Sequence, residues 1–341
     1  MLPRNFTEEQ NMFRAAYRKF LEQEIAPNIE RWREQGIVDR DAFTKAGAQG
    51  FLMIWPEEQY GGMGDKDFRF EKIIIEETSR IHGGDWANTL HSRLVGPYID
   101  RFGNDEQKAR FLPKCASGET ILAIAMTEPD AGSDLAGMRA NAKDMGDHWL
   151  LNGTKTYITN GINSDVVIVA AKTDPENNPY AVGLFLVERG TEGFERGRNL
   201  KKMGMKAQDT AELFFKDVCI PKENVLGDAT KGFIYLMEGL AEERLIGACG
   251  FLSGAHRAFE VTREFTMERK VFGKPLSKMQ NTEFKMADLR TEIDVAQAYV
   301  DQCVAAHNAG LLTSEDAAKA KLYTSELLCK MVDEGVQLHG G

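Results

Sequence analysis

The sequence lacks a long apolar run, an excess of positive charge and any obvious leader segment. No stretch approaches the ~18 apolar residues of a membrane-spanning helix, and the first five residues, Met1 to Asn5, form no signal-peptide hydrophobic region. The formal net charge is -10 and the six histidines are scattered, so no basic face suggests binding to nucleic acid or anionic lipid. We therefore expect no membrane span and no nucleic-acid partner.

The five cysteines have no pattern typical of a metal, redox or disulfide framework. They are odd in number and far apart, without a CxxC pair or a histidine at metal-ligand spacing. We interpret all five as buried free thiols in a reducing compartment. The cytoplasm is the expected location, although a mitochondrial matrix enzyme without its transit peptide would look the same. The cysteines are Cys115, Cys219, Cys249, Cys303 and Cys329.

The chain is long enough for two or three domains, because 341 residues with 43% hydrophobic side chains can supply a sizeable core. Thr7 and Gln10 have the spacing of a capping box, and apolar residues then recur at helical spacing. Residues 1–118 are predicted to form an N-terminal α-helical domain. Its further helices are expected at about 40–50, 66–81, 86–103 and 105–116.

The periodicity changes from helical to strand-like after residue 118. Short segments rich in β-branched and aromatic residues alternate with Asn-Gly and Gly turns, which predicts a small antiparallel β-domain over 119–225. No strand leads into a GxGxxG and a crossover helix, so a Rossmann dinucleotide site is not expected. The predicted strands are 121–125, 149–151, 155–159, 166–171, 184–187 and 211–215.

Residues 226–341 are helical again. Long helices are predicted at about 231–267, 278–308 and 314–338, joined by short loops. The chain as a whole is therefore predicted to be an α+β multidomain protein that ends in a helical bundle.

A polar loop follows the first predicted strand, at Ala125–Asp134. Thr127, Ser133 and Asp134 offer hydrogen-bonding side chains, and Gly132 lets backbone N–H groups approach a bound group closely. An ordinary turn has the same composition. The loop alone therefore indicates either a turn or a polar cradle for a ligand.

The helix after Lys231 places one carboxylate, Glu243, on an otherwise apolar stripe. The neighbouring positions are apolar nearly all round, so the stripe is predicted to be buried, and burial raises the pKa of a carboxylate toward the range of a general base. Glu242 lies one step off the stripe and is expected to be solvated. The alternative to a catalytic role is a structural one, in which Glu243 pairs with Arg244 or another cation.

The chain resembles the acyl-CoA dehydrogenase family over its whole length, because five short sequence strings match that family in the same order along the chain. The family's order of domains also agrees: an N-terminal helical domain, a β-barrel-like middle domain and a bundle of the four-helix type. The string Glu243-Arg244-Leu245 is similar to the long-chain and isovaleryl branches, and other strings are most like the long-chain branch. The five strings are Pro56–Gly62, the loop 125–134, Leu151–Asn160, Arg269–Lys274 and Gln337–Gly341.

The resemblance implies a role for each matching residue. Glu243 would be the catalytic base, flanked by Ala241, Glu242 and Arg244 at the thioester end of an acyl-CoA, which Ser133 would also touch. FAD would be bound by Ile124, Ala125, Met126, Thr127, Gly132, Ser133, Tyr157, Ile158 and Thr159 around its ring and pyrophosphate, and by Arg269, Gln280, Gln337, Leu338, His339, Gly340 and Gly341 around its adenine half, across a subunit interface.

The reaction implied is α,β-dehydrogenation of an acyl-CoA to the trans-2-enoyl-CoA in fatty-acid β-oxidation. Electrons would pass to an electron-transferring flavoprotein, and the expected assembly is a homotetramer, a dimer of dimers. The alternatives are an acyl-CoA oxidase, a nitroalkane-oxidase-like flavoprotein, a dehydrogenase for other acyl-CoAs, and a non-catalytic scaffold with the same fold. Relatives continue beyond the position of Gly341 with further helices, so we expect the chain to be truncated.

Overall fold

The computed structural model describes residue 4 and residues 6–174, 176–178 and 180–340. Contacts divide the chain into two compact units. The first, here called the helical unit, comprises the residues up to Arg18, Asp67–His82 and the residues from Leu240 onward. The second, the sheet unit, comprises Lys19–Lys66 and Gly83–Gly239. The division into three domains at residues 118 and 225 stays a prediction.

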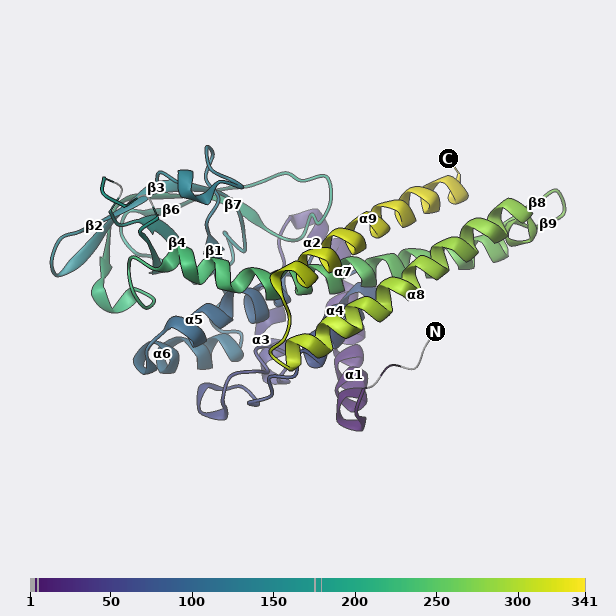
Figure 1. The fold of residues 1–341 in the computed structure, drawn as a ribbon, viewed down its shortest axis with the longest axis horizontal. Helices are drawn as coiled ribbons and strands as arrows, with labels where there is room; N and C mark the ends of the chain where they lie inside the picture. The colour runs from purple at the N-terminus through teal and green to yellow at the C-terminus, as the bar shows by residue number, and fades with distance from the viewer. Residues whose placement is uncertain (1–3, 5, 175, 179, 341) are drawn as a thin grey trace. The chain divides into compact units, whose positions relative to one another are not determined.

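The first part of the chain is helical, as expected. Thr7 and Gln10 form the predicted capping box, in which each backbone N–H donates to the other residue's side chain, at 3.1 and 3.2 Å. Asn104 and Gln107 form a second box. The helices are α1 (Glu8–Phe20), α2 (Ile29–Gln35), α3 (Asp41–Ala48), α4 (Phe68–Arg80), α5 (Gly96–Phe102) and α6 (Asp105–Ala116), with π-helical turns at Leu21–Ile25 and Leu90–Val95 (Figure 1).

Seven strands of the described residues form one sheet in the sheet unit, in the order β1-β4-β2-β3-β7-β6, with β5 paired to β4. Most pairings are antiparallel, as predicted, but β1 and β2 each pair with β4 in parallel. The chain between β1 and β4 is long enough for the crossover that a parallel pair needs. The strands are β1 (Leu122–Ala125), β2 (Asn141–Asp144), β3 (His148–Thr159), β4 (Val166–Lys172), β5 (Val182–Glu188), β6 (Phe194–Asn199) and β7 (Thr210–Pro221).

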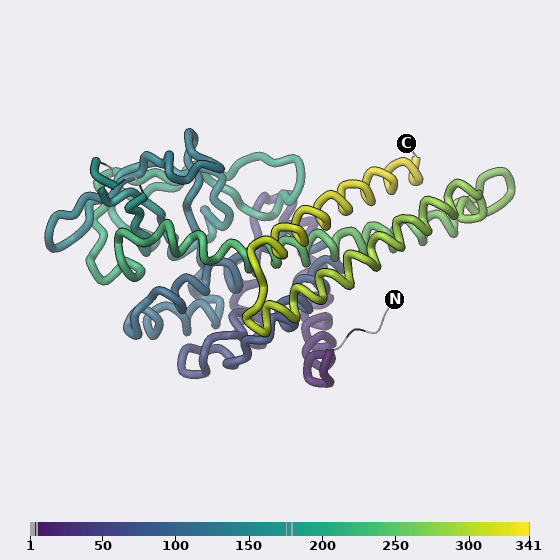
Figure 2. The backbone as a smooth tube through the Cα atoms, viewed as in Figure 1, coloured from purple at the N-terminus to yellow at the C-terminus, as the bar shows by residue number. Residues whose placement is uncertain are grey.

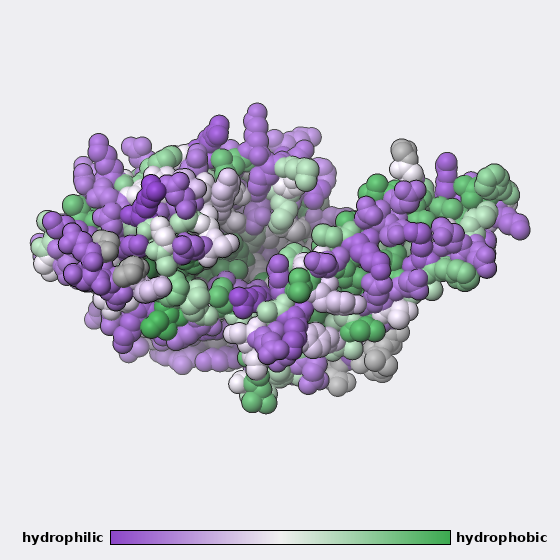
Figure 3. Space-filling view, turned by 45° about the horizontal axis from the view of Figure 1, so that its top comes forward, coloured by the Kyte–Doolittle hydropathy of each residue, from purple (hydrophilic) through white to green (hydrophobic). Residues whose placement is uncertain are grey.

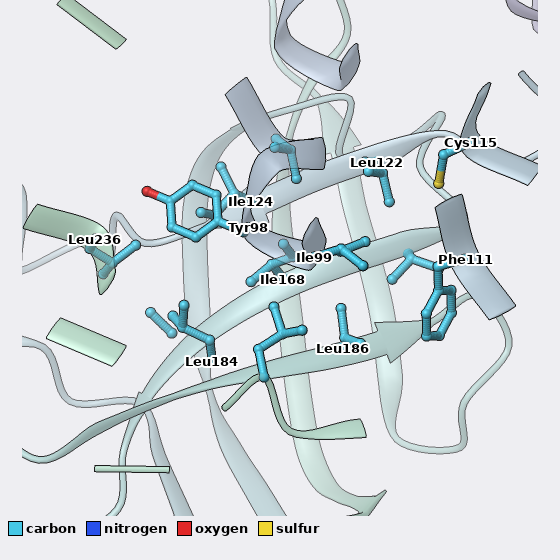
Figure 4. Packing of buried hydrophobic residues seen from close by; sticks show 14 of the residues in the cluster. Tyr98, Ile99, Phe111, Cys115, Leu122, Ile124, Ile168, Leu184, Leu186 and Leu236 are labelled. Carbon is cyan, nitrogen blue, oxygen red and sulfur yellow. The ribbon is translucent and has the colours of Figure 1, made fainter. Parts of the chain in front are cut away.

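The central strands bury both faces, because successive side chains point to opposite sides of a sheet. Leu122 and Ile168 belong to a core that also contains residues of α5, α6 and β5. Val167 belongs to a second core with Trp149 and Phe215. The sheet therefore has a rigid centre from which its loops project. Figure 4 shows the first core with Tyr98, Ile99, Phe111, Cys115, Leu122, Ile124, Ile168, Leu184, Leu186 and Leu236.

Long helices dominate the helical unit, close to the predicted ranges. They are α7 (Gly232–Glu268), which belongs to this unit from Leu240 onward, α8 (Gln280–Asn308) and α9 (Ser314–His339). A small hairpin of β8 (Lys270–Val271) and β9 (Lys274–Pro275) joins α7 to α8. In Figure 2 the yellow-green to yellow tube turns back from α8 into α9. Phe68 and Ile75 of α4 complete the core that these helices share.

On the face shown in Figure 3, polar residues predominate and apolar residues form small scattered patches. Within the ranges that the structure describes, no helix is long and apolar enough to cross a membrane.

The cysteines are free thiols, but two of them are not buried. The prediction of burial is wrong for Cys219 and Cys329, which are exposed. Cys219 alternates along β7 with the buried Val218 and Ile220, so its side chain lies on the solvent face.

Candidate functional site

The polar loop leaves β1 and returns to the sheet at β2, within the sheet unit. Glu128 and Ala131 exchange backbone hydrogen bonds of 2.9 and 3.2 Å, which forms a tight turn with Asp130 exposed at its tip. Gly132 and Ser133 follow and are also exposed. The tip of the loop, from Asp130 to Ser133, therefore carries polar groups that are exposed.

Two loop hydroxyls are available to a ligand. Thr127 is half-buried and Ser133 is exposed. In the part of the chain that the structure describes, neither side-chain hydroxyl hydrogen-bonds to another protein group. A hydroxyl both donates and accepts, so this donor set suits the polar pyrimidine edge and the pyrophosphate of FAD.

The loop runs beside the end of β3, where the strand is irregular. The Thr156 N–H donates to the Thr127 carbonyl at 2.9 Å. The register of β3 against β7 shifts between Lys155 and Ile158, and Tyr157 takes a positive φ of 58°. This bulge leaves the Tyr157 side chain 69% exposed. The structure thus brings Thr127 next to Thr156, which directly precedes Tyr157 in the chain.

The other flavin residues predicted in the sheet unit differ in what they offer. The side chains of Ile124, Ala125 and Ile158 are buried in the two hydrophobic cores, so a ligand can meet only their main chain. Met126 and Thr159 are half-buried. The prediction that Ile158 lines the ring can therefore hold only for its backbone.

A buried ion pair holds the loop against β3. Lys155 Nζ lies 2.8 Å from Glu128 Oε1 and donates to the Met126 carbonyl at 3.0 Å. The Glu128 carboxylate also accepts from the backbone N–H groups of Arg139 at 2.6 Å and Ala140 at 3.0 Å. These bonds tie the beginning of the loop to its end.

Both members of this pair have shifted pKa values. Burial alone would raise the pKa of Glu128, but the hydrogen bond and charge of Lys155, with two backbone N–H groups, outweigh it and hold that pKa below its usual value. Burial lowers the pKa of Lys155, and the bond and charge of Glu128 only partly offset this.

The helix α7 carries the predicted base, but its buried face differs from the predicted one. Glu242 is 7% exposed, whereas Glu243 is half-buried. Glu242, Leu245, Cys249 and Leu252 recur at helical spacing and all face the core. The expectation that Glu242 is solvated is therefore wrong, and the fully buried stripe lies one residue away from Glu243.

Glu242 lies against α8 in the helical unit. Its Oε2 is 3.4 Å from His307 Nε2, and the His307 ring packs against Phe68 with centroids 4.9 Å apart. The Glu242 carboxylate therefore belongs to a contact between helices. Ala241 and Arg244 on either side are half-buried, as is Glu243.

The residues predicted for the adenine half of FAD lie far along the same helices. Arg269 directly follows α7, and its carbonyl accepts from the Leu276 N–H at 2.7 Å across the hairpin. The Phe265 and His339 rings stack with centroids 4.2 Å apart, which brings the ends of α7 and α9 together. Gln280 begins α8, Gln337 and Leu338 lie in the last turn of α9, Gly340 caps it, and Gly341 lies outside the described residues.

Glu243 is distant from that second group. From Glu243 to the end of α7 at Glu268 the helix rises about 38 Å at 1.5 Å per residue. Within one chain, most of the length of α7 therefore separates the predicted base Glu243 from the predicted adenine-binding residues.

Sequence reasoning gave no role to Glu128 or Lys155, although both lie in strings that carry the family resemblance. A signal was present: Lys155 is a charged residue within the predicted strand 155–159. Its partner is 27 residues away in sequence. Only the fold shows which acid neutralises it.

Three family models match the chain. The descriptions are "Acyl-CoA dehydrogenase, N-terminal domain" for residues 7–119, "Acyl-CoA dehydrogenase, middle domain" for 123–218 and "Acyl-CoA dehydrogenase, C-terminal domain" for 230–341. Together they account for most of the described residues.

Individual relatives agree with these models. The mouse "Long-chain specific acyl-CoA dehydrogenase, mitochondrial" is 46% identical over 99% of this chain and 79% of its own length. The "Isovaleryl-CoA dehydrogenase, mitochondrial" of Pongo abelii is 38% identical over 98% of this chain and 80% of its own. A crystal structure of acyl-CoA dehydrogenase from Geobacillus kaustophilus matches with a TM-score of 0.97 and 44% identity, over 100% of this chain and 90% of that one.

Proposed function

Because the chain belongs to the acyl-CoA dehydrogenase family, whose members are FAD-dependent oxidoreductases acting on CH–CH groups, we propose that it converts a long-chain acyl-CoA to the trans-2-enoyl-CoA in fatty-acid β-oxidation. The observation that carries the chain-length assignment is the 46% identity with the mouse long-chain enzyme, against 38% with the isovaleryl enzyme. Glu243-Arg244-Leu245 is the string that the resemblance associates with these branches.

The sheet unit supplies the proposed flavin site. When bound, FAD accepts the hydrogen that leaves the β-carbon of the substrate as a hydride. The Thr127 hydroxyl would bond the pyrimidine edge, and Ser133 would bond the pyrophosphate and touch the acyl-CoA. Tyr157 and Thr159 would line the ring. The exposed loop and the bulge in β3 support these roles, because they leave polar groups without protein partners at one place.

Glu243 is the proposed base that removes the α-proton. Partial burial favours this role, because a half-buried carboxylate is less well hydrated than one on the surface. The contact of Glu242 with His307 supports the choice between the two neighbours, since Glu242 is used in helix packing. Ala241 and Arg244 would flank the thioester.

The second group of residues implies a second copy of the chain. Arg269, Gln280 and Gln337–Gly341 would bind the adenine half of FAD held by a neighbouring subunit, in a dimer of dimers. Their distance from Glu243 along α7 supports this arrangement. So do the exposed apolar side chains on α8 and α9, because such surfaces are typical of protein interfaces. Phe284, Val295, Leu322 and Val336 are 61, 59, 61 and 70% exposed.

The proposed electron acceptor is an electron-transferring flavoprotein. The proposed locations are the mitochondrial matrix and the bacterial cytoplasm. The name of the mouse relative says that it is mitochondrial. Oxygen is the acceptor that distinguishes an oxidase. Rapid reoxidation of the reduced protein in air, without a requirement for electron-transferring flavoprotein, would assign it to the oxidases instead.

The test of substrate class is an anaerobic titration of the FAD-loaded protein with butyryl-, isovaleryl-, glutaryl- and palmitoyl-CoA. We expect palmitoyl-CoA to bleach the flavin with the highest ratio of kcat to KM. Each methylene that fits an apolar pocket contributes about 0.8 kcal/mol, so the preference for palmitoyl-CoA over butyryl-CoA should exceed about tenfold. Higher efficiency with isovaleryl- or glutaryl-CoA would refute the long-chain assignment.

A further inference from the structure

The Glu128–Lys155 ion pair is unusual because both of its side chains are buried. The Lys155 side chain is 0% exposed and that of Glu128 is 4% exposed. Removing two charges from water costs several kcal/mol per ion, and a buried pair seldom adds net stability over apolar residues of similar size. Overall stability therefore does not explain why charged residues occupy these positions.

The contacts of the pair give a more specific reason. Glu128 lies near the start of the loop, and its carboxylate accepts from the backbone N–H groups of Arg139 and Ala140 at the end of the loop. One carboxylate therefore joins the two ends of the loop. Lys155 fixes that carboxylate and the Met126 carbonyl to β3. We call the Glu128–Lys155 pair with its backbone bonds the clasp. Thr127 directly precedes Glu128 in the chain, and the turn that leads to Ser133 directly follows it.

The clasp also acts next to the bulge in β3. Lys155 immediately precedes Thr156, whose N–H donates to the Thr127 carbonyl, and Tyr157, which has the positive φ. The main chain around Thr127 is thus held by bonds from two successive residues of β3. These bonds fix the path of the main chain from which the Thr127 side chain projects.

We propose that Lys155 and Glu128 are positioning residues that hold the loop in the shape in which Thr127 and Ser133 bind FAD. The inference rests on the proposed assignment of this loop to the cofactor. Neither residue needs to touch FAD, since both act through the main chain of residues 126–140. Removing the ion pair therefore weakens FAD binding without unfolding the sheet.

The variants must avoid leaving a lone charge in the core. Lys155→Met alone leaves the Glu128 carboxylate buried without a cation and risks misfolding. The double variant Lys155→Met/Glu128→Gln removes both charges and keeps both side-chain volumes. Lys155→Arg keeps the charge and donors, and is the rescue variant. Arg139→Ala removes the exposed ion pair with Asp130, at 2.9 Å, and keeps the backbone N–H, so it is the matched control.

The experiment measures FAD release and hydrogen exchange on the full-length protein. FAD release is followed by the rise in flavin fluorescence after dilution. Exchange is compared between peptides from residues 126–140 and from the buried strand β4. For the double variant we expect FAD release about tenfold faster, from the loss of charge-assisted hydrogen bonds, and faster exchange in the loop with β4 unchanged. Lys155→Arg should restore slow FAD release at least in part, and Arg139→Ala should match the wild type.

Three results would overturn the proposal. Wild-type FAD release and loop exchange in the double variant would show that the clasp does not shape the loop. Faster exchange in both the loop and β4 would show a general loss of stability. If the wild-type loop gains no protection when FAD is added to the stripped protein, the assignment of the loop to the cofactor fails first, and the proposal fails with it.

Discussion

His91 makes the stability of the sheet unit depend on pH. The ring is 0% exposed and bridges two backbone groups: the Leu122 N–H donates to Nδ1 at 3.1 Å, and Nε2 lies 3.0 Å from the Cys115 carbonyl. Because Nδ1 accepts a hydrogen bond, the neutral ring with its proton on Nε2 satisfies both neighbours. A second proton on Nδ1 would face the Leu122 N–H.

The size of the stability loss on acidification follows from the pKa of His91. Burial lowers the pKa of His91 from 6.5 to about 4. The folded pKa lies below the unfolded one, so the unfolded chain takes up the proton first, and stability falls as the pH drops from 6.5 toward 4. Linkage gives a loss of about 2 kcal/mol between about pH 7 and pH 5, and about 3 kcal/mol in full.

The assay is urea unfolding at about pH 7 and pH 5, followed by tryptophan fluorescence, for the wild type and for His91→Gln. Glutamine does not titrate, so the variant loses the His91 contribution while every other group still titrates. We expect the wild type to lose about 2 kcal/mol more than the variant over this interval. Equal losses would refute the reasoning, whatever the stability of the variant at neutral pH.

Two further predictions concern backbone geometry. Gly118 has a φ of 78°, and a Cβ there would overlap the Phe43 carbonyl, so Gly118→Ala should lower the free energy of unfolding by about 3 kcal/mol. Gly84→Ala, where a Cβ meets nothing within 4 Å, is the control, and an equal effect of both would contradict the overlap. Asn104→Ala removes the capping box with Gln107 and should cost about 1 kcal/mol in the same assay; no loss would mean that the box is not stabilising.

The helices could be predicted well from the sequence because their signals are local. A capping box such as Thr7 and Gln10 needs only residues three apart. The sequence predicts an Asn-Gly turn between the strands 149–151 and 155–159. The structure instead has a bulge within β3 at Asn152 and Gly153, where Asn152 pairs with the distant Asp217 at 2.8 and 3.1 Å. Where the partner is far along the chain, the sequence pattern does not reveal the outcome.

The candidate site shows the same limit. The loop residues lie in one short string, so Thr127 and Ser133 could be proposed as flavin ligands from the sequence. The buried face of α7 depends on which neighbours pack there, and an apolar stretch nearly all round the helix could not distinguish Glu242 from Glu243. The pairing of Glu128 with Lys155 depends on the path of the loop between two strands. These are tertiary facts that a motif does not encode.

The most direct test of the proposed function is anaerobic reduction of the bound flavin by palmitoyl-CoA in wild type, Glu243→Gln and Glu238→Gln. Glu238 is an exposed carboxylate on the same helix and serves as the control. We predict that the wild type and Glu238→Gln bleach at similar rates, and that Glu243→Gln keeps its flavin but bleaches at least ~100-fold more slowly, because it lacks the base. Bleaching of Glu243→Gln at the wild-type rate would contradict the assignment of Glu243.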